Sequence, residues 1–436
     1  MPPDFEWKTY PETELFIEQL IEEACASNED ISAFSSRTAS LTATSFQEWV
    51  ESITLSGALL YELERLGFSL QKTFYGQKLF VHSRGSFPAL RVFPGPVPVV
   101  RALTLKVESL SVFRFLSGYY GEVDGTPGSD YSRILLSDRG GILLFAAEKN
   151  ADSWMPEDLE SQGLLDLEQA HSLMSQRRRF FEAGEDAWKH TERLVDRVIS
   201  LVGKDRCASL FLEYERRYWE ARNSAARFLK ARQDTMGLGW GNHDHHTFRS
   251  ERRSVFRFVQ LLLTMGFHLR ERFFSSLGTA QSPYGVQVLE HPGLGAVINI
   301  HVDLRDDEKD FDFSTNPLPD VQHWGDVSLW TGMYGESVFE AGLYHLGAKY
   351  DYWHLKELLK GVRIDIREPD SESPFLVRAA VHPENWFSSR LRQEHLHANG
   401  ALTDDQLHKL TREGSLGSFL ECVHRVDGFK GFKTPS

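Results

Sequence analysis

The 436-residue chain has only three cysteines, Cys25, Cys207 and Cys422, and they lie far apart without C-x-x-C spacing. An odd, scattered set of thiols argues against a disulfide framework and favours buried, reduced side chains in a cytoplasmic protein. The sequence also lacks any run of about 18 apolar residues, so we expect no membrane-spanning helix. Residues 1–8 contain no apolar stretch, and we expect no secretory signal.

An excess of positive charge is missing as well. The chain has 48 Lys and Arg residues against 62 Asp and Glu residues, a formal net charge of −14. This balance argues against a nucleic-acid-binding surface as the main function. Locally basic runs such as 177–179 are expected to be solvated helix faces. The glycine-rich segment 237–241 lacks the lysine of a phosphate-binding loop, and no serine or cysteine stands in a nucleophile elbow.

The composition is nevertheless that of a folded protein, because 41% of the residues are apolar and 12% aromatic. The length predicts two or three structural units. We divide the chain into an N-terminal α+β module (1–155), a helical insertion (156–235), a β-rich module with the candidate metal site (236–370) and a C-terminal α+β tail (371–436).

Local patterns predict several elements. Apolar residues at helical spacing indicate an amphipathic helix over 11–27, and a second helix over 44–66 that opens with a capping box. Two apolar runs around a glycine-containing turn predict a hairpin within 129–147. Residues 156–233 are charged, with little Gly or Pro, and predict two or three packed helices.

The segment 241–249, Gly-Asn-His-Asp-His-His-Thr-Phe-Arg, concentrates metal-binding side chains. Neutral imidazole is the commonest metal ligand, and a nearby arginine suits an anionic substrate. Alternation along a strand would send His243 and His245 to one face, and Asp244 and His246 to the other. We interpret the segment as a metal-binding strand; a surface loop of hydrated imidazoles is the alternative.

The residues after this segment predict a βαβββ order. Residues 254–267 have helical spacing, and the apolar runs 286–289 and 296–302 have the length of strands. The pattern resembles that of vicinal oxygen chelate modules, which hold a metal on the inner face of a curled sheet. We therefore expect an α+β fold with two vicinal oxygen chelate-like β-rich modules and an inserted helical block.

Short matches in the same order along the chain resemble the 2-oxoadipate dioxygenase/decarboxylase (hydroxyglutarate synthase) family. Residues 245–250 resemble its His-Leu-Thr-Pro-Arg-Thr strand, and 333–336 its Arg-Phe-Gly-Glu strand. Residues 80–83 are similar to its Val-His-Ser strand. Residues 415–419 resemble a segment that lines its substrate pocket.

The resemblance implies a cytoplasmic Fe(II) oxidoreductase that oxidises and decarboxylates a small 2-oxo acid with O₂. It implies His245 and Glu336 as metal ligands, and Ser415 as a substrate contact. The alternatives are that Glu336 is a buried carboxylate paired with an arginine, with Glu340 as its nearest rival, and that Ser415 is an ordinary turn serine. Arg249, on the His245 face by alternation, could pair with a substrate carboxylate or form a structural ion pair. The chain departs from the family pattern of a His followed four residues later by an Arg, because His82 is the single histidine of its N-terminal third.

A second nitrogen ligand is therefore expected at another position. His243 ranks first because it shares a strand with His245. His82 ranks second, from the other module, and His301 third, from a neighbouring strand about 4.8 Å away. Two imidazoles and a carboxylate form the facial triad of non-haem Fe(II) oxygenases, which leaves positions for a 2-oxo acid and O₂.

Two other functions stay open. The chain could be a non-catalytic relative that binds a small acid and has lost the metal site. It could also be a metal-dependent phosphoesterase, because residues 241–244 match the Gly-Asn-His-Asp block of calcineurin-like phosphatases and 244–246 the triplet of DHH phosphoesterases. Neither match has its partner blocks elsewhere in the sequence.

Overall fold

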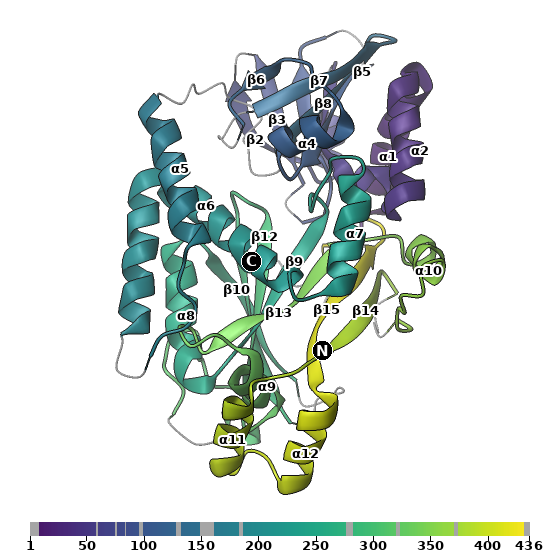
Figure 1. The fold of residues 1–436 in the computed structure, drawn as a ribbon. Coiled ribbons are helices and arrows are strands. Elements are labelled where there is room, and N and C mark those ends of the chain that lie inside the picture. The colour runs from purple at the N-terminus through teal and green to yellow at the C-terminus, as the bar shows by residue number, and fades with distance from the viewer. Residues whose placement is uncertain are drawn as a thin grey trace.

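Two separate β-sheets with flanking helices make up the structure, a computed structural model (Figure 1). It describes residues 8–430 apart from 58–59, 75, 83, 96–98, 128–131, 149–160, 183–185, 276–281, 320–322 and 370–373. The expected α+β class with two β-rich modules is confirmed by these two sheets.

The first sheet has eight strands in the order β2-β3-β4-β1-β5-β8-β7-β6. Its strands are β1 (Val50–Ser56), β2 (Ser69–Phe74), β3 (Gln77–Val81), β4 (Ala89–Phe93), β5 (Val99–Val107), β6 (Val123–Gly125), β7 (Ser132–Arg139) and β8 (Ile142–Glu148). Helices α3 (Leu60–Arg65) and α4 (Leu110–Ser117) follow β1 and β5, so the sheet consists of two βαβββ units. β1 runs parallel to β4 and antiparallel to β5, and β5 runs parallel to β8.

The second sheet has seven strands in the order β10-β11-β12-β9-β13-β15-β14. Its strands are β9 (His243–Ser250), β10 (His268–Ser275), β11 (Tyr284–His291), β12 (Ala296–Asp303), β13 (Ala341–Lys349), β14 (Leu376–Trp386) and β15 (Ser415–Arg425). β9 runs parallel to β12 and antiparallel to β13, and β13 runs parallel to β15. The described strands thus repeat the plan of the first sheet with one strand fewer.

The predicted βαβββ order is confirmed, with α8 (Arg252–Thr264) between β9 and β10. The predicted hairpin is β7–β8, whose turn uses Gly140 and Gly141 at positive φ. The predicted helix 11–27 is α1 (Pro11–Ser27), and α2 (Glu29–Thr42) packs beside it.

The helix predicted for residues 44–66 is wrong. The structure has the 3-10 turn η1 (Phe46–Trp49), then β1 and the short helix α3 in this region. Residues of β1 are buried on both faces and the strand pairs with β4 and β5. A strand that is covered on both faces and paired on both edges is a central strand, and this tertiary pairing overrides the helical spacing.

Helices α5 (Ser161–Ser175), α6 (Ala187–Glu220) and α7 (Ser224–Asp234) connect the two sheets in sequence (teal in Figure 1). Rings of α6, β9 and α8 meet in one core: Phe211 packs on Phe248, and Phe248 on Phe258. One face of the second sheet is therefore covered by helices, and the opposite face is left for the site.

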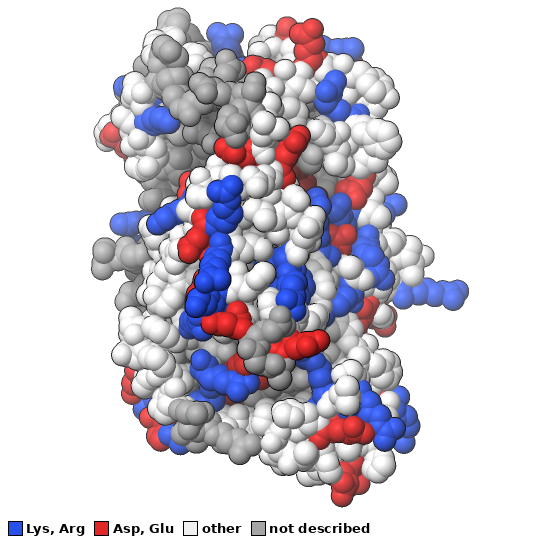
Figure 2. Space-filling model, turned by 60° about the vertical axis from the view of Figure 1, so that its left-hand side comes forward, with Lys and Arg blue, Asp and Glu red and all other residues white. Residues whose placement is uncertain are grey.

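The remaining elements are η2 (Asp306–Glu308), α9 (Asp326–Tyr334), α10 (Tyr352–Lys360), α11 (Arg390–Ala398) and α12 (Asp404–Glu413). Helices α11 and α12 lie together beside α9 at the lower end in Figure 1. None of the described helices is both long and apolar enough to cross a membrane. On the face in Figure 2, basic and acidic side chains are intermixed.

Candidate metal centre

Three side chains from three strands of the second sheet converge on one point. His245 lies on β9, His345 on β13 and Glu421 on β15. His245 Nε2 is 3.0 Å from Glu421 Oε2 and 3.2 Å from His345 Nε2. The distance between His345 Nε2 and Glu421 Oε2 is 3.5 Å. The side chains are only 12%, 10% and 9% exposed, in the order His245, His345, Glu421. Among the described residues, no other three His, Cys, Asp or Glu side chains bring their ligand atoms so close together.

The spacing of these atoms suits a divalent metal. Metal bonds of about 2.1 Å place neighbouring ligand atoms about 3.0 Å apart in an octahedron and about 3.4 Å apart in a tetrahedron. The observed separations of 3.0, 3.2 and 3.5 Å cover this range. Two imidazole nitrogens and one carboxylate oxygen on one face form the donor set of a facial triad.

Strand register and a glycine create this convergence. Gly347 of β13 pairs with His245 on one side and with Glu421 on the other, so the three residues form one row across the sheet. A Cβ atom on Gly347 would lie 2.4 Å from Cε1 and 2.5 Å from Nδ1 of His245. Because Gly347 has no side chain, the His245 ring can lie over it and reach Glu421. His345, two residues earlier on β13, points to the same face and stacks on Phe419.

The predicted ligand His243 lies on the other side of the sheet. In the β9–β13 ladder Gly347 pairs with His245 but Ala348 pairs with His243, so Asp244 is an extra, bulged residue. A bulge resets the alternation of side chains, which is why His243 and His245 do not share a face. The His243 ring instead contacts the Trp240 carbonyl oxygen and the His246 ring.

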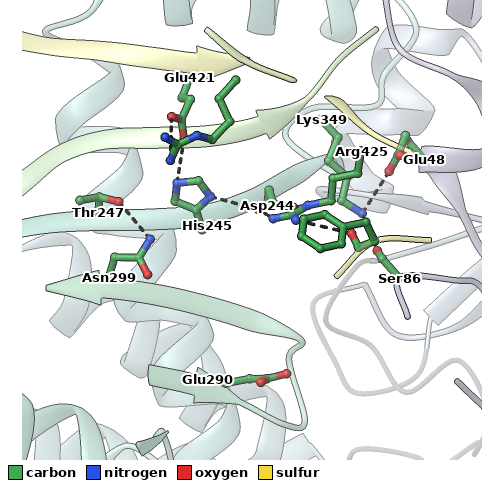
Figure 3. Close-up of polar contacts among 12 residues, drawn as sticks. Glu48, Ser86, Asp244, His245, Thr247, Glu290, Asn299, Lys349, Glu421 and Arg425 are labelled. Carbon is green, nitrogen blue, oxygen red and sulfur yellow. Dashed lines mark hydrogen bonds and ion pairs between the residues drawn. The ribbon is translucent and has the colours of Figure 1, made fainter. Parts of the chain in front are cut away.

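The bulged Asp244 supports His245. Its Oδ1 lies 3.0 Å from His245 Nδ1, and Arg425 donates to both of its carboxylate oxygens at 2.9 and 3.1 Å (Figure 3). Burial lowers the pKa of His245, but the carboxylates of Asp244 and Glu421 outweigh burial and raise it to about 9. Burial opposes ionisation of Glu421, yet the two imidazoles hold its pKa well below the usual range. The two carboxylates thus favour a positive charge beside them, whereas burial lowers the pKa of His345.

Glu336, expected as the carboxylate ligand, is engaged elsewhere. It lies just after α9, and its two oxygens accept hydrogen bonds from Arg177, each at 3.0 Å. Arg179 also binds it, at 2.9 Å, and both arginines bind Glu215. This four-residue ion-pair network keeps Glu336 away from the triad. The prediction that the basic run 177–179 is a solvated helix face is therefore wrong for Arg177, which is buried in this network.

His82, expected as a ligand, also lies apart from the triad. It belongs to the module built on the first sheet (the first module), where Tyr10, Phe68 and Phe87 surround its ring and Gly85 N donates to its Nδ1. Burial lowers the pKa of His82 to about 4. Residue 83, part of the same family-like segment, lies outside the described residues.

Ser415 begins β15, six residues before Glu421 and hence about 20 Å along the strand. Its hydroxyl hydrogen-bonds to the Tyr334 hydroxyl at 2.7 Å. The third-ranked nitrogen candidate, His301, stacks on Tyr284 and is not one of the three converging residues. The structure therefore keeps Ser415 away from the metal-binding atoms. His301 lies on the site face, because it pairs with Arg249, and burial together with the charges of His345, Arg249 and His245 holds its pKa well below the usual range.

Arg249 does point to the site face. No bulge separates it from His245 in the pairing of β9 with β12, so the two residues share a face. Its guanidinium lies 3.6 Å from the Tyr344 ring centroid and 5.8 Å from that of Trp330. In the described part of the chain it has no carboxylate partner, and its Nε is buried without a hydrogen bond.

His345 and Glu421 were missed by the sequence reasoning. Each is an ionisable residue inside an apolar strand, Leu-Tyr-His-Leu-Gly in β13 and Phe-Leu-Glu-Cys-Val in β15. Burying such a group is costly unless it is paired or binds a metal. An ionisable residue within an otherwise apolar strand was therefore the sequence signal that could have identified His345 and Glu421 as candidate ligands.

No family model and no curated protein matches the chain. Among solved structures, a 4-hydroxymandelate synthase variant from Streptomyces coelicolor is 11% identical, with 88% of this chain and 94% of that chain covered and a TM-score of 0.24. The 2,3-dioxygenase LapB from Pseudomonas sp. KL28 is 11% identical, with 91% and 95% covered and a TM-score of 0.20. The Mn(II)-bound glyoxalase from Novosphingobium aromaticivorans is 9% identical, with 86% and 82% covered and a TM-score of 0.20. At these identities and scores, the likenesses carry no conclusion about the reaction of this chain.

Proposed function

We propose that this protein is a non-haem Fe(II) dioxygenase/decarboxylase that acts on a small 2-oxo carboxylic acid with O₂. The observation that carries the proposal is the convergence of His245, His345 and Glu421 on one face of the second sheet. His345 would provide the second nitrogen that was expected at His243, His82 or His301. A bound iron would supply O₂ activation and open coordination positions for the two oxygens of a 2-oxo acid.

The residues of the chain supply the rest. His245 and His345 would offer their Nε2 atoms to the metal, and Glu421 a carboxylate oxygen. Arg249, whose guanidinium stacks on Tyr344 and has no carboxylate partner among the described residues, would bind a substrate carboxylate. A structural ion pair was the alternative role for this arginine, and the missing partner favours the substrate.

The other two functions have weaker support. The non-catalytic alternative rested on a missing nitrogen ligand, and His345 offers one. The phosphoesterase alternative rested on the blocks 241–244 and 244–246, whose partner blocks are absent from the sequence, and the bulge at Asp244 gives His243 and Asp244 different partners. His243 contacts Trp240, whereas Asp244 is bound by Arg425.

Iron loading tests the proposal. Purified protein, loaded with Fe(II) in anaerobic buffer, should retain one iron per chain and should consume O₂ and release CO₂ with a member of a panel of 2-oxo acids. His345→Ala and Glu421→Gln should abolish both properties. His243→Ala is the matched control, because it removes an imidazole from the opposite face of β9 and should leave iron binding unchanged. Iron-free wild-type protein, or iron binding that depends on His243 but not on His345, would overturn the proposal.

A further inference from the structure

The first module has the strand plan of the second but no comparable ligands. Strands β1, β5 and β8 correspond in order and direction to the ligand strands β9, β13 and β15. None of the three contains a histidine. The first module therefore cannot hold a metal in the manner of the second, and its contribution to the protein must be of another kind.

A short segment after β15 joins the two modules. The amide of Tyr10 donates to the Asp427 carbonyl oxygen at 2.8 Å, and the amide of Ser86 donates to that of Gly428 at 2.9 Å. Gly85 and Phe429 form an antiparallel bridge. Tyr10, Gly85 and Ser86 all belong to the N-terminal part of the chain, so residues 427–429 are held on the first module.

Gly428 shows how close this contact is. Its φ is +61°, and a Cβ atom would lie 1.9 Å from Cζ of Phe87. Only glycine fits here without displacing either the segment or the Phe87 ring. The contact between residues 427–429 and the first module therefore depends on a glycine at position 428.

The same segment also contacts Arg425, which binds Asp244 beside the proposed metal ligand His245. Arg425, the last residue of β15, lies over the Phe429 ring at 5.7 Å and donates to the Phe429 carbonyl oxygen at 3.5 Å. Its other donors bind both oxygens of Asp244, which lies 3.0 Å from Nδ1 of His245 (Figure 3). A continuous set of contacts thus runs from the first module through Phe429, Arg425 and Asp244 to His245.

A second link lies nearby. Lys349, two residues after Gly347, places its Nζ 3.0 Å from Glu48 and 3.3 Å from the Ser86 hydroxyl, both in the first module (Figure 3). It ties β13 to the same region of the first module as the segment 427–429. The first module is thereby attached to β13 and to the end of β15, the strands that carry His345 and Glu421.

We propose that Asp244 and Arg425 are positioning residues for His245, and that the first module holds them in place by docking the segment 427–429. The inference rests on the proposed metal centre and adds a role for the first module. Asp244 accepts a hydrogen bond from Nδ1–H of His245, which fixes the ring orientation and leaves Nε2 free as a ligand. Arg425 holds that carboxylate in place through two parallel hydrogen bonds.

Metal affinity measured without turnover tests this inference. The full-length chain is titrated with Co²⁺ alone, and both the dissociation constant and the visible absorption of the bound cobalt are recorded. Asp244→Ala removes the direct support and should raise the dissociation constant about 10- to 100-fold. Gly428→Ala touches neither the ligands nor their charges, and by loosening the docked segment should raise it about 2- to 30-fold. Both variants should change the absorption bands, because the His245 ring loses its fixed orientation.

The matched control is Gly237→Ala. Gly237 also has a positive φ, +76°, and its Cβ would lie 2.9 Å from backbone atoms of Phe113 in the first module. It is thus a strained glycine at a different contact between the two modules, and none of the described contacts named above leads from it to Asp244, so cobalt binding should match the wild type. Should Gly428→Ala fail to fold, Arg425→Lys gives the same test, since lysine keeps the charge and loses the paired hydrogen bonds.

The outcomes separate the two proposals. A wild-type chain that binds no Co²⁺ would overturn the metal centre and this inference together. A wild-type chain that binds Co²⁺ through His245, with unchanged affinity and spectrum in Asp244→Ala and Gly428→Ala, would overturn the positioning role alone. An equal loss in Gly428→Ala and Gly237→Ala would also overturn it, because the effect would then be general loosening of the modules.

Discussion

One added methyl group at Gly347 should remove the metal while leaving the sheet in place. A Cβ atom at this position would lie 2.4 Å from Cε1 of His245, whereas ordinary contacts of a Cβ atom begin at 3.4 Å. The ring must therefore retreat by about 1 Å, which is several times the tolerance of about 0.2 Å on metal–ligand distances. We expect Gly347→Ala to weaken metal binding by more than the 10- to 100-fold typical of changes in outer-shell residues.

The same substitution should cost little in folding. Overpacking of this kind typically destabilises a protein by about 1–3 kcal/mol. Metal titration and urea unfolding of the same samples separate the two effects. Gly342→Ala is the control: it lies on the same strand, and its Cβ would lie 3.1 Å from Trp330, so a shift of a few tenths of an ångström accommodates it. Wild-type metal affinity in Gly347→Ala would refute the role given to this glycine and to the position of the His245 ring.

Three further outcomes are expected. Arg249→Gln should lower kcat/KM about 10- to 100-fold by removing a charge-assisted hydrogen bond, with unchanged metal affinity in a titration. Glu336→Ala should leave metal binding intact but destabilise the fold by about 3–5 kcal/mol in urea unfolding, because Arg177 and Arg179 lose a buried partner; loss of the metal would instead favour the original assignment of Glu336 as a ligand. Burial lowers the pKa of His82 to about 4 in the folded protein, from the ordinary histidine value of 6.5. The unfolded chain therefore binds more protons between pH 6.5 and 4, and the free energy of unfolding should fall by up to about 1.4 kcal/mol for each pH unit of acidification in this window. The pH dependence should be smaller in His82→Asn, and an identical dependence in both proteins would contradict the assignment.

Local patterns in the sequence predicted elements better than the site. The α1 helix, the β7–β8 hairpin and the βαβββ unit from β9 to β12 each follow from periodicity and turn residues within one short segment. The helix predicted over 44–66 failed because β1 gains its stability from pairing with β4 and β5, which lie far away in sequence. Strand pairing of this kind leaves no mark in the local pattern.

Of the three residues of the candidate metal site, the sequence predicted only the one that can be recognised within a single short segment. His245 could be selected from the histidine-rich strand alone. His345 and Glu421 reach it through the register of β13 and β15, which follow 100 and more residues later. His243 was selected by strict alternation, and a single bulged residue, Asp244, invalidated that reasoning. Glu336 was selected by resemblance to a motif, and its neighbours in space, Arg177 and Arg179, could not be read from the motif.

The two sheets of this chain show that the fold alone does not make the site. Both have the same order of strands around a central antiparallel pair, β1–β5 in one and β9–β13 in the other. Only the second places imidazoles and a carboxylate on its three corresponding strands. Two features without ligand atoms complete it: Gly347 leaves room for the His245 ring, and the bulge directs Asp244 to its Nδ1. A search for ligand residues alone would overlook both, although a change at either one should weaken metal binding at least about 10-fold.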